Sequence, residues 1–264
     1  GKMLGSRHFG GTKNEDGRSF VELPDGGNVI AGTTESYGDG EGDIWLIKVD
    51  AQGRLKWWYT YGGTGSDRAY DIKNTTDGGF VVTGRSSSFG VGVYSTFLLK
   101  TDSEGNQQWF STSGGAQDEG QSVVQMPDGG FLTIGRVYAG LGNFQIYLAK
   151  FDANGNSNID STRIIGFTSY EEAYSITPSR DGNYIITGKT LLDNFGGDFQ
   201  ELVFKIDPSG NVIWTKSYGG EQEDIGLSIQ PTNKGYVVAG YTLSFGHGKA
   251  DIYVLNIDEN GELQ

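Results

Sequence analysis

Five acidic residues occupy equivalent positions along the sequence, each directly before a short segment rich in apolar residues. They are Glu15, Asp67, Asp118, Glu171 and Asp224. Two carboxyl groups can act as general acid and general base when their surroundings keep one protonated and the other charged. These five acids occupy equivalent positions of a repeated pattern. Such regularity is expected when the same turn is repeated, whereas a catalytic site needs two acids in different surroundings. We therefore expect them to accept backbone hydrogen bonds as structural groups, with catalysis as the alternative.

The residues that follow each acid are small or carry a hydroxyl group. After Glu15 come Gly17 and Ser19, and the other repeats keep this spacing, with Asp71 in place of the serine in one of them. Successive side chains of a strand point to opposite faces, so a spacing of two predicts that all three positions lie on one face. We expect the small residue where neighbouring strands crowd together.

A second recurring set consists of aromatic residues in glycine-rich loops such as "SFGVG". Its members are Tyr37, Phe89, Tyr138, Phe195 and Phe245. Exposed rings can stack on sugar rings or pack against apolar side chains of a protein partner. We expect these loops to lie on the same rim as the acids and to bind a glycan or protein ligand. The alternative interpretation is that the rings cover the ends of the strands.

The loop "DGEGD" places Asp39, Glu41 and Asp43 in alternation. Calcium prefers several oxygen ligands on a flexible backbone, so this loop is a candidate calcium site, with a solvated acidic loop as the alternative. We expect no other cofactor. The chain has no cysteine and two histidines, His8 and His247, which leave little for a thiolate metal site, a multi-histidine site or a Ser-His-Asp triad.

The composition is typical of short strands joined by tight turns. Glycine accounts for 44 of the 264 residues, proline for 5, and aromatic residues for 12%. A formal net charge of −13 gives an acidic surface that repels phosphate groups, so we expect no nucleic-acid partner. No apolar run approaches the ~18 residues of a membrane-spanning helix, and no signal-peptide pattern is present. The sequence therefore indicates a soluble protein or a mature, processed chain.

The segment "DGGFVVTG" at residues 77–84 has close counterparts elsewhere in the chain, such as "DGGFLTIG" and "DGNYIITG". Diglycine pairs begin at Gly10, Gly62, Gly114 and Gly219, which are spaced by 52, 52 and 105 residues. The last spacing corresponds to two periods, so the repeat is 52 to 53 residues long. The predicted repeats are residues 10–61, 62–113, 114–165, 166–218 and 219–264, with residues 2–9 completing the last one.

Each repeat predicts four antiparallel strands. The DGG turn joins the first strand to the "FVVTG" strand, and a third strand ends in aspartate before a hairpin turn such as "DSEGN". In these turns the aspartate can bond to its own backbone and the glycine supplies a positive φ. The sequence therefore predicts an all-β, five-bladed β-propeller over residues 1–264, a single domain in which the N-terminal strand closes the last blade as its outermost strand.

The recurring pattern of "DGGFVVTG", "SFGVG", "FLLKTD" and "GNQQW" resembles propeller repeats common in bacterial and archaeal secreted or cell-surface proteins. It is more loosely similar to kelch and pyrroloquinoline-quinone-type repeats. The resemblance implies a secreted or surface-displayed prokaryotic protein. We interpret the chain as a monomeric, non-catalytic binding scaffold that recognises a glycan or protein at its loop face. The alternative is a five-bladed glycoside hydrolase that uses carboxylates near the central channel.

Overall fold

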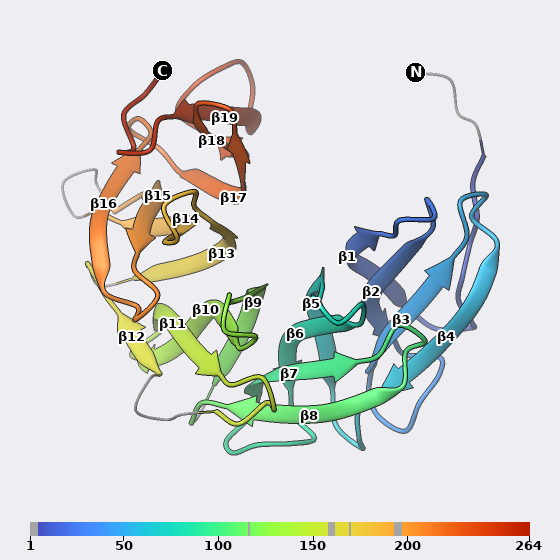
Figure 1. The fold of residues 1–264 in the computed structure, drawn as a ribbon. Helices are drawn as coiled ribbons and strands as arrows, with labels where there is room; N and C mark the ends of the chain where they lie inside the picture. The colour runs from blue at the N-terminus through green and yellow to red at the C-terminus, as the bar shows by residue number, and fades with distance from the viewer. Residues whose placement is uncertain (1–4, 116, 158–161, 169, 193–196) are drawn as a thin grey trace. The chain divides into compact units, whose positions relative to one another are not determined.

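The computed structural model describes residues 5–115, 117–157, 162–168, 170–192 and 197–264. Throughout these residues the regular secondary structure is β-strand, as predicted, and none of them forms a helix (Figure 1). No helix of this described part could therefore cross a membrane. The chain divides into two compact units, residues 1–131 with 151–157 and residues 132–150 with 158–264, which are described separately.

The first unit contains two four-stranded antiparallel sheets. Its strands are β1 (Glu15–Glu22), β2 (Asn28–Thr34), β3 (Asp43–Val49), β4 (Leu55–Tyr61), β5 (Asp67–Asn74), β6 (Phe80–Ser86), β7 (Ser95–Thr101), β8 (Gln107–Ser113) and β9 (Asp118–Gln125). The sheet orders are β1-β2-β3-β4 and β5-β6-β7-β8, so consecutive strands are neighbours, as the repeat predicts (Figure 1).

The second unit contains the remaining strands, except that Phe131 of β10 and Phe151 of β11 belong to the first unit. These are β10 (Phe131–Gly140), β11 (Asn143–Phe151), β12 (Arg163–Ile165), β13 (Glu171–Pro178), β14 (Tyr184–Leu191), β15 (Phe199–Ile206), β16 (Val212–Tyr218), β17 (Asp224–Thr232), β18 (Gly235–Thr242) and β19 (Asp251–Ile257). One sheet has the order β13-β14-β15-β16 and another the order β17-β18-β19. Strands β12, β11 and β10 pair in that order.

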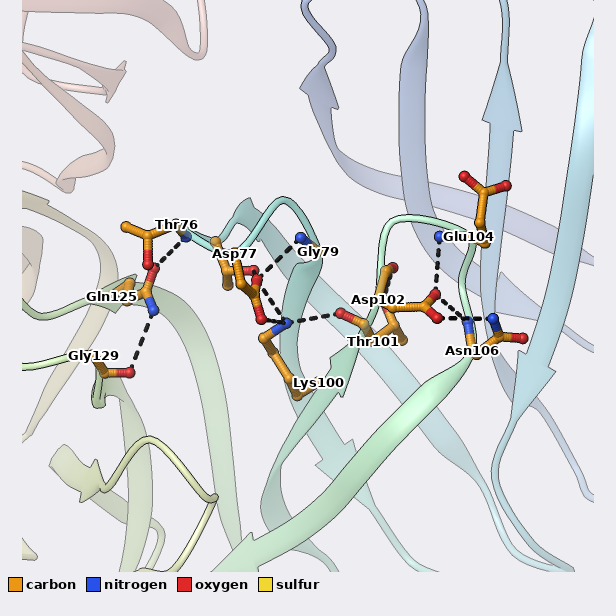
Figure 2. A network of polar contacts seen from close by, with 11 residues as sticks. Thr76, Asp77, Gly79, Lys100, Thr101, Asp102, Glu104, Asn106, Gln125 and Gly129 are labelled. Carbon is orange, nitrogen blue, oxygen red and sulfur yellow. Dashed lines mark hydrogen bonds and ion pairs between the residues drawn. The ribbon is translucent and has the colours of Figure 1, made fainter.

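The DGG turn between β5 and β6 shows why this motif recurs (Figure 2). Asp77 accepts a hydrogen bond from the backbone N–H of Gly79 at 3.1 Å and pairs with the buried ammonium group of Lys100 at 2.9 Å. Gly78 has a φ of 84°, and a Cβ on Gly79 would lie 2.1 Å from the carbonyl oxygen of Thr101. Both positions therefore require glycine, and the turn is fastened to the third strand of its sheet.

The hairpin turn between β7 and β8 has the predicted chemistry. Asp102 accepts backbone hydrogen bonds from Glu104 and Asn106, both at 2.9 Å, and Gly105 has a φ of 84° (Figure 2). The side-chain bond from Asn106, together with these backbone bonds, holds the pKa of Asp102 below its ordinary value. The sequence prediction for this turn is confirmed.

The apolar core of each unit lies between neighbouring sheets. In the first unit Ala31 and Leu46 of one sheet pack in a single cluster with Ile72 of the next, and all three are fully buried. In the second unit Val203 and Ile229 belong to a corresponding cluster. Burial of both faces explains why these strands are apolar runs without clean alternation.

The first strand of a repeat departs from the alternation that the sequence predicted. In β1 the pairing with β2 shifts between Gly17 and Ser19, so the ladder skips Arg18. The same shift occurs at the equivalent residues of β5, β13 and β17. A bulge moves the residues beyond it to the opposite face. The prediction that the acid, the small residue and the serine share one face is therefore wrong.

The bulge brings the side chain of Asp71 in β5 between β1 and β9, which are the first strands of the two neighbouring repeats. Its carboxylate accepts hydrogen bonds from the hydroxyl groups of Ser19 at 2.9 Å and Ser122 at 2.8 Å. The ammonium group of Lys73 lies 2.6 Å from the same carboxylate. Because these donors surround the carboxylate, Asp71 joins β1, β5 and β9 as a structural link.

The sheet of β17, β18 and β19 contains three strands, and no strand is present in the described residues 5–14. Phe9 packs instead against Trp45, Ile47 and Val49 of the first sheet. The N-terminal strand that closes the last blade is thus not seen in the described residues, and it stays a prediction, as does the single domain.

Candidate functional site

The five repeated acids lie at the start of β1, β5, β9, β13 and β17, where each bonds to the loop before it. Asp67 accepts the N–H of Gly63 at 2.9 Å, and Asp224 accepts that of Gly220 at 2.8 Å. Asp224 also accepts the hydroxyl group of Ser244 at 2.7 Å. Equivalent backbone bonds are made by Glu15, Asp118 and Glu171. These contacts support the structural interpretation of the acids.

The loop aromatic residues of the first unit pack on their own sheets. The ring of Tyr37 lies 5.0 Å from that of Trp58, centroid to centroid, and its hydroxyl group donates to the carbonyl of Gly10 at 3.0 Å. Phe89 lies 5.0 Å from Phe110, remains 45% exposed, and lines a hollow of about 250 Å³. Each ring therefore covers its sheet on one side, and Phe89 keeps an open side.

The second unit repeats this arrangement at Phe245, whose ring lies 5.7 Å from Tyr253 and is 49% exposed. Tyr138 is 37% exposed. Phe195 lies outside the described residues. The geometry fits a cover for the strands and leaves ring surface open to a ligand, so the binding role of these residues stays a prediction.

The acidic loop at residues 39–43 does not gather its three carboxylates. Asp43 is buried and accepts the N–H of Gly40 at 3.2 Å, while Asp39 and Glu41 are exposed. Burial raises the pKa of Asp43. Within the described residues no three His, Cys, Asp or Glu side chains lie close enough together to hold a metal ion. The calcium site stays a prediction.

Glu172, the second residue of β13, is the centre of a polar cluster that the sequence analysis missed. This carboxylate is almost fully buried, at 2% exposure. It accepts hydrogen bonds from the hydroxyl groups of Tyr170 at 2.6 Å and Tyr174 at 3.0 Å. Arg136 lies 2.9 Å and Lys189 3.3 Å from its oxygens. Four donors from β10, β13, β14 and the loop before β13 thus fix the position of one carboxylate.

The charge state of this cluster follows from its contacts. Burial acts to raise the pKa of Glu172, but the hydrogen bond from Tyr170 and the positive charges of Arg136 and Lys189 outweigh it and bring the pKa below its ordinary value. Burial and the nearby carboxylate raise the pKa of Tyr174. At neutral pH the cluster therefore holds a charged carboxylate and protonated phenols.

An aromatic row adjoins the Glu172 cluster. It consists of Tyr138, Phe144, Tyr170 and Phe199, whose successive ring centroids are 5.6, 5.7 and 4.9 Å apart in edge-to-face contacts. The guanidinium group of Arg136 lies 4.7 Å from the centroid of Phe144. The row therefore connects the buried carboxylate with the half-exposed ring of Tyr138.

Glu201 on β15 is in register with the same cluster. Lys189 lies opposite Glu172 in the β13–β14 pair and opposite Glu201 in the β14–β15 pair. Glu201 is 1% exposed, and among the described residues neither of its carboxylate oxygens has a hydrogen-bond partner. Burial, and secondly the charge of Asp224, raises the pKa of Glu201 to about 8. This carboxyl group is therefore mostly protonated at neutral pH.

Two carboxyl groups of opposite protonation thus belong to one row across β13, β14 and β15. Residues directly opposite one another in an antiparallel pair share a face, and strands are spaced by about 4.8 Å, so the backbone positions of Glu172 and Glu201 are roughly 10 Å apart. The row therefore combines a charged carboxylate, which can act as a base, with a protonated carboxyl group, which can act as an acid.

The sequence carried a signal for Glu201 that went unused. Its counterparts in the third strands of the other repeats are Ile44, Thr96, Ile146 and Ile252. A carboxyl group at a position otherwise occupied by isoleucine or threonine marks a departure from the repeat. Glu172 was missed because it directly follows Glu171, and the repeat pattern drew attention to that structural acid.

No known protein-family description matches the chain. The regulatory protein FlaEY of Caulobacter vibrioides is 24% identical to it over 275 aligned residues. The match covers 92% of this chain and 28% of FlaEY, so the chain spans little more than a quarter of that relative.

Several solved structures share the fold. A protein of unknown function from Bacteroides caccae superposes with a TM-score of 0.58 and 12% identity, over 96% of this chain and 81% of that one. For the endo-arabinase of Bacteroides thetaiotaomicron the TM-score is 0.52 and the identity 11%, over 94% and 96% of the two chains. For the exo-β-1,3-galactanase of Phanerochaete chrysosporium the TM-score is 0.53 and the identity 12%, over 91% of this chain and 60% of that one. The likeness shows a β-propeller fold.

These comparisons correct the functional prediction made from the sequence. The endo-arabinase and the exo-β-1,3-galactanase are glycoside hydrolases, and this likeness contradicts the prediction of a non-catalytic scaffold and favours the glycoside hydrolase alternative. The β-propeller resemblance is confirmed, whereas the looser likeness to kelch and pyrroloquinoline-quinone-type repeats stays a prediction.

Proposed function

We propose that this chain is a glycoside hydrolase with its catalytic groups in the second unit. The observation that carries the proposal is the row of Glu172 and Glu201, two carboxyl groups whose surroundings hold one charged and the other protonated. Glu172 accepts a proton from the attacking water as general base. Glu201 donates a proton to the oxygen of the leaving sugar as general acid.

Lys189 and Arg136 have supporting roles in this mechanism. Both contact Glu172, at 3.3 Å and 2.9 Å, and keep it charged before reaction. When Glu172 takes up a proton, its two cationic neighbours lose their counter-charge. We infer that their ion pairs set the basicity of Glu172, so that weakening either pair raises the pKa of this carboxyl group.

Substrate must displace side chains to reach the two carboxyl groups, because both are almost fully buried. Tyr170 covers Glu172 through its hydroxyl group and lies edge-to-face with Phe199. A sugar ring that replaces the ring of Tyr170 offers its own hydroxyl groups to Glu172 in place of the phenol. The aromatic row then supplies apolar surface beside the bound sugar.

The finer features of the fold belong to the same proposal. We propose that the five sheets are five blades of one propeller, that the N-terminal strand closes the last blade, and that the protein is a secreted or surface-displayed monomer that binds a glycan. The 52-residue repeat and the antiparallel four-stranded sheets support the blade assignment. A calcium ion at Asp39, Glu41 and Asp43 is part of this proposal.

The test is hydrolysis of arabinan, xylan and β-1,3-galactan by the purified chain, followed as release of reducing sugar. We expect at least one polysaccharide to be cleaved, and Glu172→Gln and Glu201→Gln each to reduce the rate by about a thousandfold. Glu119→Gln is the matched control, since Glu119 is equally buried and is paired with Arg85 at 2.6 Å in the first unit. Equal loss in the control variant would show that folding, and not catalysis, was affected.

A regulatory role is the second candidate function, and the likeness to FlaEY favours it. The match covers 92% of this chain at 24% identity. If none of the three polysaccharides is cleaved while the chain is folded, the glycoside hydrolase proposal fails and the regulatory candidate gains support.

A further inference from the structure

The hairpin that joins β10 to β11, with the sequence "YAGLGNF" at residues 138–144, has an unusual backbone. Leu141 has a φ of 53° and is the only residue other than glycine with a positive φ among the described residues. Its neighbours Gly140 and Gly142 also have positive φ values, of 93° and 83°. Leucine is disfavoured in this conformation because its Cβ approaches the following carbonyl oxygen. A glycine or asparagine at this position would remove the strain.

Packing within the chain does not explain the leucine. Leu141 is fully exposed, and a Cβ added at Gly140 or Gly142 would have no neighbouring atom within 4 Å. The tip of the hairpin is therefore open, and the apolar side chain of Leu141 stabilises nothing that the structure describes. A strained residue that the fold does not require is a reason to look for a ligand contact.

The hairpin tip is connected to the Glu172 cluster by the aromatic row. The hydroxyl group of Tyr138 accepts a hydrogen bond from the backbone N–H of Gly142 at 3.1 Å, which fastens the tip to the half-exposed ring. Tyr138 contacts Phe144, Phe144 contacts Tyr170, and the Tyr170 hydroxyl group bonds to Glu172. A chain of ring contacts thus runs from the base of the hairpin tip to the carboxylate.

We propose that Leu141 and Tyr138 determine specificity by binding a sugar residue of a polymeric substrate beyond the bond that is cleaved. This inference rests on the proposed function and names its substrate class as an extended, uncharged polysaccharide. A pyranose or furanose ring presents C–H groups to the leucine and the phenol ring, while its hydroxyl groups remain in water. A single sugar residue at the carboxyl groups does not reach the hairpin tip.

The size and charge of this surface favour a sugar chain over other occupants. Two side chains, one of them 37% exposed, form an apolar area much smaller than a stable protein interface requires. The net charge of −13 disfavours contact with an anionic lipid surface. The polysaccharide is therefore the occupant that the hairpin fits.

The test compares the parent with Leu141→Gly on a small and a large substrate, and with Tyr138→Ala on the large substrate alone, because the Tyr138 ring belongs to the aromatic row beside the bound sugar. For 4-nitrophenyl α-L-arabinofuranoside we expect unchanged kcat/KM. For arabinan we expect KM to rise roughly tenfold, since a lost apolar contact in a subsite has an effect of this order. Val91→Gly in the first unit is the matched control, because Val91 is another exposed apolar loop residue. Equal effects on both substrates, or none on either, would overturn the proposal.

A second measurement separates this inference from the proposed function. Retardation of the folded chain in gels that contain arabinan, xylan or β-1,3-galactan reports binding without catalysis. We expect the Glu172→Gln variant to be retarded by at least one polysaccharide and the double variant Glu172→Gln, Leu141→Gly to lose that retardation. If Glu172→Gln binds and the parent cleaves, but Leu141→Gly changes neither, the subsite is wrong and the hydrolase stands. If neither the parent nor any variant is retarded by a polysaccharide, the subsite proposal is overturned as well.

Discussion

Lys189 lies directly opposite Glu201 in the β14–β15 pair, yet its ammonium group pairs with Glu172, 3.3 Å away, on the other side of β14. Glu201 therefore has an immediate cross-strand cation that does not neutralise it, and no hydrogen-bond donor from the part of the chain that the structure describes reaches its oxygens. Lys189 thus helps to keep Glu172 charged, while burial and the charge of Asp224 raise the pKa of Glu201. This asymmetry distinguishes the row from the five structural acids, which the repeat places in equivalent surroundings.

The first prediction concerns the stability cost of Glu201. Burial and Asp224 raise its pKa from an ordinary 4.5 to about 8, so between these pH values the folded state binds more protons than the unfolded state. The free energy of unfolding therefore falls as pH rises through this window, by up to about 1.4 kcal/mol per pH unit from this group. We expect Glu201→Gln to match the parent near pH 4 and to be more stable at pH 8.

Urea unfolding of both proteins from pH 4 to pH 8 measures this difference. The matched control is Glu262→Gln, since Glu262 is an exposed carboxylate in the same unit and its removal changes the pH profile little. Parallel profiles for the parent and Glu201→Gln would contradict the assignment of a protonated carboxyl group.

The second prediction concerns the ion pairs of Glu172. Replacing Glu172 with Gln leaves Arg136 and Lys189 without their counter-charge in a nearly buried site, which should reduce the free energy of unfolding by about 3 kcal/mol at pH 7. The pKa of Glu172 is lowered in the folded state, so its contribution is lost as pH falls below its ordinary range. The difference between variant and parent should therefore shrink toward pH 3.

Denaturant titrations at pH 7 and pH 3 provide the measurement. Asp16→Asn serves as the control, because Asp16 forms an exposed pair with Arg18 and should contribute less than about 1 kcal/mol. A loss for Glu172→Gln that stayed the same at both pH values would show that its charge is not what stabilises the fold.

The third prediction concerns the glycine that ends the "FVVTG" strand. A Cβ on Gly84 would lie 1.9 Å from the carbonyl oxygen of Arg68 in the neighbouring strand, so Gly84→Ala should destabilise the protein by about 3 kcal/mol or more. Gly115→Ala is the matched control, since no atom lies within 4 Å of a Cβ there, and it should change stability by less than about 0.5 kcal/mol. Similar melting temperatures for the two variants would contradict the close approach of the strands at Gly84.

The repeat made much of the fold predictable from the sequence. The DGG turn and the Asp-x-x-Gly hairpins follow from local chemistry, because a positive φ needs glycine and an aspartate can bond to its own turn, as Asp77 and Asp102 do. The bulge at Gly17 and Ser19 was not predictable in this way. It depends on how a first strand meets its neighbours, which spacing along one chain segment does not reveal.

The candidate site was harder to predict than the fold. Repetition directs attention to residues that every repeat shares, such as Asp67 and Asp224, and these are loop caps. Glu172 and Glu201 come together only through the pairing of three strands, and Tyr138 joins them through ring contacts. The informative signal was the departure of Glu201 from the repeat, not the repeat itself.

The most direct measurement of the central claim is the pH dependence of kcat/KM for hydrolysis of the polysaccharide that the parent cleaves. If Glu201 is the general acid, the rate must fall as pH rises past about 8, where the group loses its proton, and Glu201→Gln must lose about a thousandfold in rate while remaining folded in urea at least as well as the parent. Hydrolysis that continued to rise above pH 9, or that kept the parent's rate in Glu201→Gln, would contradict the account.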